Sequence, residues 1–381
     1  MRGAPTVALQ LAGWLAGWAV FGRVHPLPGN GAPASGVAAG EGPSATVVVP
    51  VRDEAGRLPR LLDALGRDRA AGGRWELVVV DDGSTDGSAA IAAAAGARVL
   101  TASPPPGWNG KAWACSVGAQ AATGQVLVFL DADTEPEPGF VGAISQAAVA
   151  LDGMVSVQPW HRVERTYEQL SALANVVALM AGTGVVAPEG RTWWRGPVGF
   201  GPAIAVSAER YRQSGGHRSA RAAVAEDLAL AAAVHAAGFA VAAYGPGGHG
   251  PGISYRMYPG GPRELIEGWA KNLAAGAQAL PPLRGALAAT WVAGAVSAAV
   301  AMSGAVLSRG RHGRNQRLAP VGYGLFAAQV SLLVRRAGRF HPATGPFFPL
   351  PLAAFVLLCA RSWISRLTGQ GALWRGRLVA A

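Results

Sequence analysis

Apolar residues occur in two kinds of run along this chain. Short runs rich in Val and Leu alternate with helical patterns between residues 46 and 280, whereas longer runs with few charges lie near both ends. Strands that alternate with helices are typical of a mostly parallel α/β sheet covered on both faces. Apolar runs of roughly 17 to 25 residues are long enough to cross a bilayer. The pattern therefore predicts an α/β domain held at a membrane.

The middle region predicts a definite order of elements. Strands are expected at 46–50, 76–80, 96–100, 125–130 and 203–207, and helices near 55–66, up to 95, up to 122 and at 228–237. Residues 166–187 are apolar but carry Glu168, Gln169 and Asn175, so we expect an interfacial or core helix there rather than a span.

The apolar ends predict membrane segments. Residues 5–22 are expected to form an N-terminal transmembrane segment, with a cleaved signal peptide as the alternative. Residues 23–45 are rich in Pro, Gly, Ala and Ser and are predicted to be a linker to a domain at 46–280. In the C-terminal region, 281–381, two or three spans are expected, and arginines on both sides of them leave the topology open.

Charge is distributed unevenly along the 381 residues. Residues 281–381 contain twelve arginines and no acid, so subtracting them from the total of +11 leaves about −1 for residues 1–280. A basic excess confined to an apolar region indicates membrane flanks and excludes the basic folded surface of a nucleic-acid-binding protein. The two cysteines, Cys115 and Cys359, suggest no disulfide framework.

Lysine is rare in this chain. Only Lys111 and Lys271 are lysines among the 33 cationic residues. An ammonium is a compact point charge, whereas a guanidinium is a planar fork. We therefore expect these two lysines to perform roles that arginine cannot.

Two aspartates follow the buried strand at 125–130. Ligands of open α/β sheets bind at the carboxyl ends of the strands, and Asp131 and Asp133 are expected there. Crowded carboxylates are costly unless a cation lies between them. Oxygen ligands suit Mg²⁺ or Mn²⁺, which can also bind a diphosphate. The pair predicts a divalent-metal site, with a turn or helix cap as the alternative.

Three further positions carry candidate chemistry. Asp81 and Asp82 follow the second strand, where acids can reach the base and ribose of a nucleotide; a turn and cap is the alternative. Asp227 opens a helix and is placed to accept a proton from an incoming hydroxyl or carboxylic acid, although Glu226 and Asp227 could simply complement the helix dipole. Lys111 could add positive charge at the nucleotide phosphates or be a solvated surface residue.

In this order, Val-Val-Val-Pro50, Asp81-Asp82-Gly83-Ser84, Asp131-x-Asp133 and Glu226-Asp227 resemble a family 2 glycosyltransferase with the GT-A fold over about residues 46–275. The resemblance implies an inverting enzyme that uses a nucleotide-diphosphate sugar. It implies Asp82 on the nucleotide, Asp131 and Asp133 on the metal and Asp227 as catalytic base. The nucleotide-sugar site is assigned to Pro50, Glu54, Asp81, Asp82, Lys111 and Asp131.

Three other stretches resemble one membrane-bound branch of that family. Gly107–Cys115, Arg256–Gly261 and Gly268–Asn272 are similar to the glucosyltransferases of C30 carotenoid acids (the diaponeurosporenoate type) and to hopanoid-associated glycosyltransferases. Contacts to the acceptor or to phosphate are assigned to Glu226, Arg256, Trp269 and Lys271. The Gln/Arg-x-x-Arg-Trp motif of processive polymerases is absent from the sequence, which favours transfer of a single sugar.

The sequence therefore predicts an integral membrane enzyme with its catalytic domain in the cytoplasm, where nucleotide sugars are found. The expected donor is UDP-glucose and the expected acceptor an isoprenoid lipid, above all a carotenoid acid. Polyprenyl-phosphate, hopanoid or glycolipid acceptors and a catalytically silent nucleotide-sugar-binding scaffold are the alternatives. The roles of Trp193 and Trp194 stay open between core packing and an acceptor groove, and His217 and His249 are expected to be ordinary loop residues.

Overall fold

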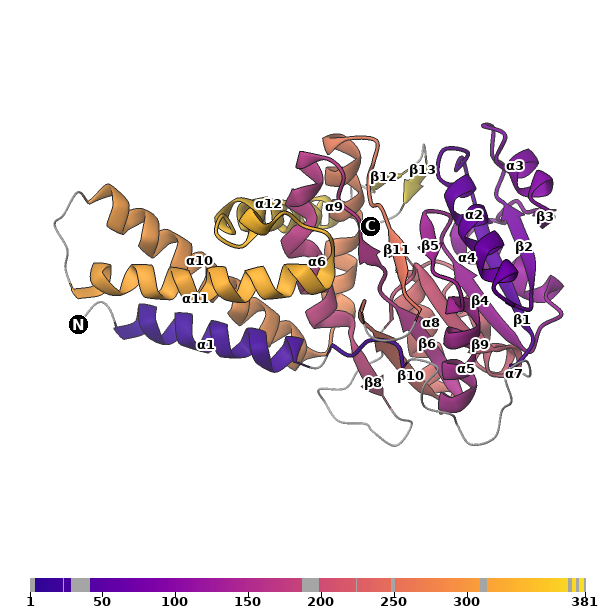
Figure 1. Cartoon of the computed structure of the whole chain (residues 1–381), viewed down its shortest axis with the longest axis horizontal. Coiled ribbons are helices and arrows are strands. Elements are labelled where there is room, and N and C mark those ends of the chain that lie inside the picture. The colour runs from indigo at the N-terminus through magenta and orange to yellow at the C-terminus, as the bar shows by residue number, and fades with distance from the viewer. Residues whose placement is uncertain are drawn as a thin grey trace. The chain divides into compact units, whose positions relative to one another are not determined.

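The computed structural model describes residues 4–22, 24–28, 42–186, 199–223, 225–247, 251–308, 314–368, 372–374 and 377–379 (Figure 1). The chain forms two compact units. The sheet unit comprises His25–Trp160 and Gly182–Arg256. The helical unit comprises Met1–Val24, His161–Ala181 and Met257–Ala381.

An eight-stranded sheet organises the sheet unit, in the order β3-β2-β1-β4-β9-β6-β10-β8. Its strands are β1 Ala45–Val51, β2 Trp75–Asp81, β3 Arg98–Thr101, β4 Val126–Leu130, β6 Gly153–Val157, β8 Gly184–Val186, β9 Ala203–Ser207 and β10 Ala240–Tyr244. Strands β3, β2, β1 and β4 pair in parallel, as do β6 and β10, while β9 runs antiparallel between β4 and β6. The predicted α/β fold with a mostly parallel sheet is confirmed.

Helices cover both faces of this sheet. They are α2 Leu58–Ala70, α3 Ser88–Ala94, α4 Gly110–Ala121, α5 Phe140–Leu151, α7 Ala208–Gln213 and α8 Glu226–Ala236. Successive side chains of a strand point to opposite faces. In β1, Val47 and Val49 accordingly join the core cluster that contains residues of α2 and α5. Val48 faces α4, where a Cβ at Gly118 would lie 2.3 Å from its Cγ1.

Two predicted segments differ in detail from the structure. The helix expected over 166–187 is present as a 3-10 helix at Thr166–Ser171 and as α6 Ala172–Gly182, but residues 184–186 form β8 at the edge of the sheet. This correction is a tertiary effect, because β8 exists only through its antiparallel pairing with β10. In the predicted linker, residues 29–41 lie outside the described part. Leu27 is nevertheless buried in the core cluster of the sheet unit.

The helical unit contains the long apolar helices. They are α1 Ala4–Phe21, α9 Pro262–Ala279, α10 Pro282–Leu307, α11 Arg314–Ala337 and α12 Pro349–Leu367. Three segments in the described residues are long and apolar enough to cross a membrane, Pro282–Leu307, Leu318–Ala337 and Pro349–Leu367. These three helices fit the expected membrane association. The N-terminal helix is apolar but shorter, and its assignment as a span stays a prediction.

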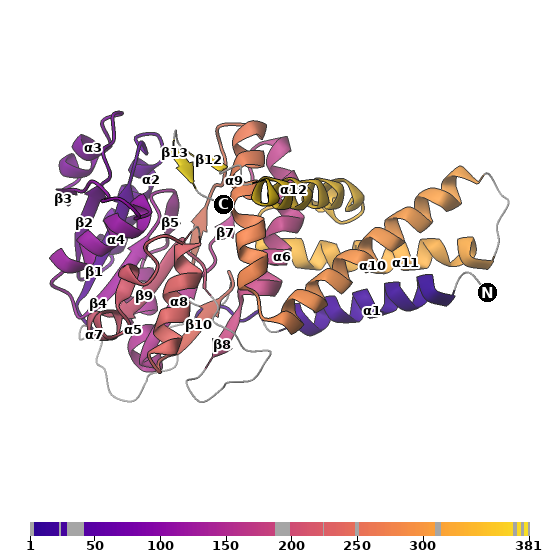
Figure 2. The same cartoon turned by 180° about the vertical axis from the view of Figure 1, so that it is seen from behind.

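Helix α1 packs tightly against α10 (Figure 2). A Cβ added at Gly13 would lie 2.9 Å from Gly294 Cα, and one at Gly17 would lie 2.4 Å from Cδ1 of the buried Trp291. The Trp291 indole N–H donates to Gln329 Oε1 at 2.9 Å, and Gln329 Nε2 donates to the carbonyl of Trp14 at 2.9 Å. Small residues spaced by four allow this close approach of two apolar helices.

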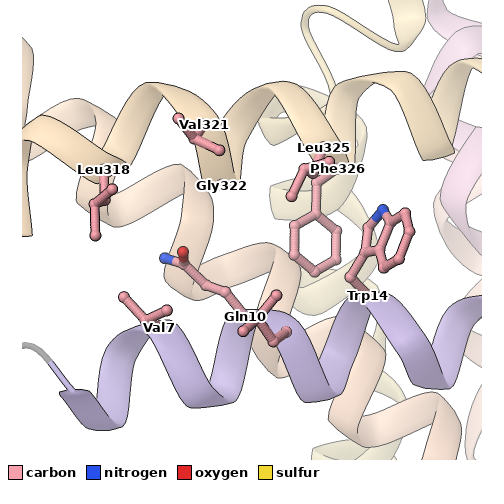
Figure 3. A pocket seen from close by; sticks show the side chains of 9 residues that line it. Val7, Gln10, Trp14, Leu318, Val321, Gly322, Leu325 and Phe326 are labelled. Atoms are coloured by element: carbon pink, nitrogen blue, oxygen red, sulfur yellow. The ribbon is translucent and has the colours of Figure 1, made fainter.

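A cavity of about 90 Å³ lies between α1 and α11 (Figure 3). Gln10 is the polar side chain among its lining residues, and its Nε2 donates to Ser297 Oγ at 3.4 Å. The remaining lining residues are Val7, Leu11, Trp14, Leu318, Val321, Gly322, Leu325 and Phe326. The cavity is thus an apolar gap within the helical unit.

Candidate active site

The carboxyl end of β4 meets the starts of α4, β9 and α8. Asp131 follows β4 directly, and its N–H donates to the carbonyl of Pro202 at 3.0 Å, which holds this turn against the entry to β9. Lys111 lies in the first turn of α4, and Glu226 is the first residue of α8. The Lys111 Nζ lies 2.7 Å from Asp131 Oδ1 and 2.8 Å from Glu226 Oε1. One ammonium therefore bridges two carboxylates from distant parts of the chain.

Electrostatics favour the charged form of Lys111 in this cluster. Burial favours the neutral amine of Lys111, but the carboxylates of Asp131 and Glu226 outweigh burial, so the pKa of Lys111 lies well above its ordinary value. Burial also raises the pKa of Asp131, and the nearby ammonium acts against that rise. The bridge thus stabilises a positive charge in a partly buried site.

Asp227 lies beside this bridge. A Cβ at Gly201 would lie 3.1 Å from Asp227 Oδ2 and 3.4 Å from Lys111 Nζ, so the glycine leaves room for both side chains. Burial, followed by repulsion from Glu226, raises the pKa of Asp227 to about 6, although Lys111 and a hydrogen bond from the Leu228 N–H oppose the shift. A carboxylate with such a pKa is ionised at neutral pH and is suited to accept a proton.

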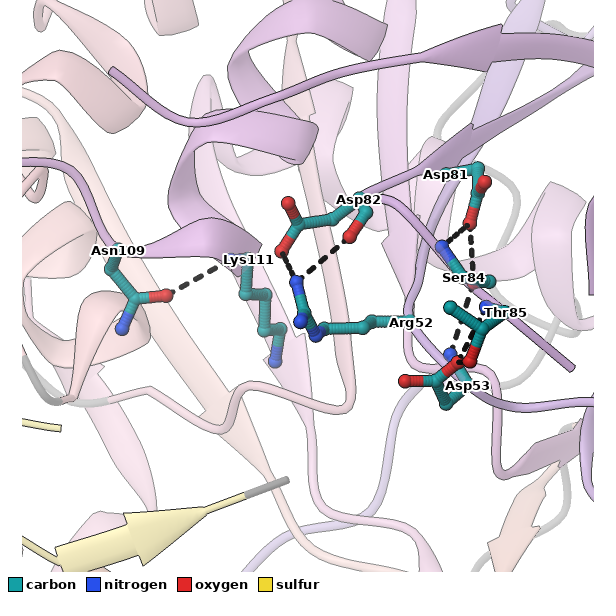
Figure 4. A network of polar contacts seen from close by, with 8 residues as sticks. All are labelled: Arg52, Asp53, Asp81, Asp82, Ser84, Thr85, Asn109 and Lys111. Carbon is teal, nitrogen blue, oxygen red and sulfur yellow. Dashed lines mark hydrogen bonds and ion pairs between the residues drawn. The ribbon is translucent and has the colours of Figure 1, made fainter. Parts of the chain in front are cut away.

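The loops after β1 and β2 are tied together by polar contacts (Figure 4). Arg52 Nη1 donates to the carbonyl of Asp82 at 2.9 Å and lies 3.4 Å from Asp82 Oδ2. Asp53, with a φ of 51°, accepts the Thr85 N–H at 2.8 Å. Both loops stand at the carboxyl ends of parallel strands, where ligands of such sheets bind.

Asp81 and Asp82 play different structural parts in these loops. Asp81 Oδ1 accepts the N–H of Ser84 at 3.1 Å and also the Ser84 hydroxyl, which is the turn-capping arrangement named as an alternative. Asp82 pairs with Arg52. Glu54 donates its N–H to Ser88 Oγ at 2.9 Å, so it too belongs to this loop network. Pro50 lies within β1, paired with Val80 of β2.

The second aspartate of the pair directly precedes a strand that pairs with the segment before Arg256. Asp133 precedes β5 Thr134–Pro136, which pairs antiparallel with β11 Ile253–Tyr255. Because Tyr255 is opposite Thr134, continuing this register places Arg256 opposite Asp133. In the part of the chain that the structure describes, no group of three or more His, Cys, Asp or Glu side chains is arranged to hold a metal ion.

Two further candidate residues belong to the helical unit. Trp269 and Lys271 are on α9 in the helical unit, where the buried Trp269 donates its indole N–H to Ser171 Oγ at 3.0 Å. Trp193, Trp194 and His249 lie outside the described residues. His217 is buried in a short 3-10 turn, and burial lowers its pKa to about 4. Cys115 is buried within α4.

Two residues gain roles that the motifs did not assign. Arg52 anchors Asp82, as described above. Asn109 caps α4, because its Oδ1 accepts a hydrogen bond from the Lys111 N–H at 2.9 Å. The backbone N–H of Asn109 donates to the carbonyl of Arg221 at 2.6 Å, and its Nδ2 donates to the carbonyl of Ala223 at 3.3 Å. Asn109 therefore ties the helix that carries Lys111 to the segment before Glu226. Its sequence signal is an asparagine directly before a helix, a favoured N-cap.

Comparisons with known proteins agree with this arrangement. The family model for glycosyl transferase family 2 matches residues 46–181. A 4,4'-diaponeurosporenoate glycosyltransferase of Staphylococcus haemolyticus is 33% identical over 271 residues, which cover 70% of this chain and 69% of that protein. The chain belongs to glycosyl transferase family 2. It is therefore a glycosyltransferase, and the family expected from its motifs is confirmed.

Two further relatives extend this likeness. The protein of the same description from Staphylococcus aureus is 29% identical over 340 residues, 87% of each chain. The solved mannosyltransferase PcManGT from Pyrobaculum calidifontis, determined with GDP-Man and Mn²⁺, has a TM-score of 0.51 and 20% identity, and the match covers 97% of this chain and 100% of that one. At that identity the match supports the fold, and this family 2 glycosyltransferase has the expected GT-A fold.

Proposed function

We propose that this family 2 glycosyltransferase transfers a single hexose, with inversion, from a nucleotide-diphosphate sugar to a membrane lipid of the isoprenoid class. UDP-glucose is the proposed donor and a carotenoid acid the proposed acceptor, in keeping with the description of its staphylococcal relatives as diaponeurosporenoate glycosyltransferases. The observation that carries the proposal is the convergence of Lys111, Asp131 and Glu226 beside Asp227 at the carboxyl end of β4.

The donor is proposed to bind along the loops after β1 and β2. Asp82, oriented by Arg52, and Glu54 would contact the nucleoside, and Lys111 would contact the diphosphate. Asp131 and Asp133 would hold Mg²⁺ or Mn²⁺; their oxygens suit such ions, and Asp131 already pairs with a cation at 2.7 Å. When bound, the ion supplies neutralisation of the charge that develops on the leaving diphosphate.

The acceptor is proposed to react next to Asp227. Its carboxylate would take the proton from the acceptor hydroxyl or carboxyl as the new bond to the anomeric carbon forms and the bond to the diphosphate breaks. Attack from the face opposite the leaving group inverts the anomeric centre. Burial and Glu226 supply the raised pKa of about 6 that makes Asp227 an effective base. Arg256, Trp269 and Lys271 remain proposed contacts to the acceptor or to phosphate.

The membrane helices support the choice of a lipid acceptor. Three described helices are apolar and long enough to cross a bilayer. An enzyme held at the membrane meets a water-insoluble acceptor within the bilayer surface rather than by diffusion through water. The sheet unit is proposed to face the cytoplasm, because nucleotide sugars are found there. Hopanoid, polyprenyl-phosphate and glycolipid acceptors are the alternatives within the same chemistry.

The test uses membranes that contain the full chain, labelled UDP-glucose, Mn²⁺ and extracted isoprenoid lipids. Label is expected in the organic phase with the wild type and with Asp63→Asn, a matched change at an exposed carboxylate of α2. It is expected to vanish with Asp227→Asn, and mass spectrometry of the product names the acceptor. Binding of UDP without transfer from any of a panel of nucleotide sugars would instead support a silent scaffold.

A further inference from the structure

We propose that Lys111 is the resident counter-ion of the Asp131–Glu226 carboxylate pair and excludes a free divalent ion until a nucleotide diphosphate binds. Metal and donor would then bind together, not metal first. This inference rests on the proposed function, because it concerns the order in which that site is filled.

The geometry places one cation on two anionic ligands. Lys111 Nζ lies at 2.7 and 2.8 Å from the carboxylates of Asp131 and Glu226, which belong to the end of β4 and the start of α8. The side chain of Glu226 is 12% exposed and that of Lys111 is 32% exposed. The ion pair is therefore partly screened from water. Charge interactions at such a partly buried site are stronger than at an open surface.

A divalent ion and this ammonium compete for the same oxygens. An ion bound at Oδ1 of Asp131 would take the place of Lys111 there, and breaking the pair would leave the ammonium partly buried with one carboxylate fewer. A nucleotide diphosphate removes this cost, because its phosphate oxygens provide Lys111 with new partners. Magnesium-type sites commonly combine one or two carboxylates with substrate phosphates, which agrees with simultaneous entry.

The environment of Lys111 suits a movable ammonium. A Cβ at position 201 would lie 3.1 Å from Asp227 Oδ2 and 3.4 Å from Lys111 Nζ, so the absence of a side chain at Gly201 leaves space beside the ammonium. Asn109 holds the backbone of Lys111 through the helix cap while the long side chain keeps its rotatable bonds. Lysine is a compact charge on a flexible stem, whereas arginine is a planar fork. The chain uses lysine at only two of 33 cationic positions, and this is one of them.

The test is a titration of the detergent-solubilised full chain with Mn²⁺, followed by electron paramagnetic resonance, with and without saturating UDP. In the wild type, UDP is expected to tighten Mn²⁺ binding about tenfold or more. Lys111→Met is expected to tighten binding of Mn²⁺ alone about tenfold, because a positive charge next to the ligand oxygen is lost. The effect of UDP on Mn²⁺ affinity should shrink accordingly.

Two variants separate charge from fold. Lys111→Gln keeps hydrogen-bond donors near both carboxylates and replaces Lys111→Met if the latter does not fold; the same tightening is expected. Arg67→Met, at an exposed cationic position of α2 outside the proposed site, should leave the binding of Mn²⁺ alone unchanged.

The outcomes are distinct. Equal Mn²⁺ affinity of the wild type with and without UDP, or no tightening in the Lys111 variants, overturns the counter-ion role while leaving the proposed function standing. If the wild-type chain binds neither UDP nor Mn²⁺, even when both are present, the proposed function itself is overturned, and this inference with it.

Discussion

Glu226 and Asp227 are adjacent in the chain but have different partners. Glu226 accepts the ammonium of Lys111 at 2.8 Å, whereas Asp227 accepts the backbone N–H of Leu228 at 2.9 Å. Glu226 thus helps to hold a cation, and it also raises the pKa of its neighbour by repulsion. The two acids at this helix start are therefore expected to respond differently to substitution.

Asp227→Asn is expected to lower the rate of sugar transfer by about 10² to 10⁴, the usual contribution of a general base. Binding of UDP with Mn²⁺ should persist, since the loops after β1 and β2 are unchanged. Initial rates and the Kd for UDP check this pair of outcomes. A variant that transfers sugar at the wild-type rate would exclude Asp227 as the base.

The rate is expected to depend on pH through Asp227. Its pKa is raised to about 6, and the base acts only when ionised, so kcat should fall as pH drops through about 6 and level off above it. A profile of kcat against pH under saturating donor and acceptor measures this limb. A rate that stays flat from pH 5 to pH 7, a range of about one unit on either side of that pKa, would contradict the assignment.

The contribution of Asp227 to folding stability should change with pH in the opposite direction to the rate. The folded pKa of Asp227 lies above the ordinary value of 3.8, so the folded state binds the proton more tightly than the unfolded state between about pH 4 and pH 6. This contribution to stability is present at low pH and is lost as pH rises through that window. Asp227→Asn should therefore raise Tm at pH 7.5 and leave it nearly unchanged at pH 4. An equal change of Tm at pH 7.5 and pH 4 would show that the ionised Asp227 carboxylate does not destabilise the fold.

Asn109 is expected to position the segment before Glu226. Asn109→Ala removes the cap of α4, which typically costs about 1 kcal/mol of stability, and also both side-chain contacts. Asn109→Asp keeps the acceptor for the Lys111 N–H but loses the donor to Ala223. If the hydrogen bond to Ala223 positions the site, Asn109→Asp should lower kcat while changing Tm little. Measuring kcat and Tm for both variants decides between positioning and simple capping.

Helix α1 is expected to be a required part of the helical unit. Gly13→Leu would force a side chain into the backbone of α10, and overpacking of this kind typically costs about 1 to 3 kcal/mol. Ala12→Leu places the same side chain at an exposed position of the helix and serves as the control. A thiol-reactive dye can follow unfolding through the half-buried Cys359 of α12. Equal Tm values for the two variants would show that this packing contributes little.

The sequence by itself determined the local elements and the acids that end them. The strand expected at 203–207 is β9 with the same bounds, and Asp131 follows a strand as its apolar run predicted. Short apolar runs and helix-start residues act over a few positions, so they can be recognised in a single chain. The family resemblance added roles that this local pattern could not supply.

Only the tertiary structure decided which of these residues meet. Lys111 reaches Asp131 and Glu226 because α4 and α8 begin where β4 ends, with β9 inserted antiparallel beside β4. Strand β8 likewise depends on a distant partner, β10. The hydrogen bond from Asn109 to the carbonyl of Ala223 also joins distant parts of the chain. Such contacts arise from strand order and packing, which no local pattern of apolar and polar residues encodes.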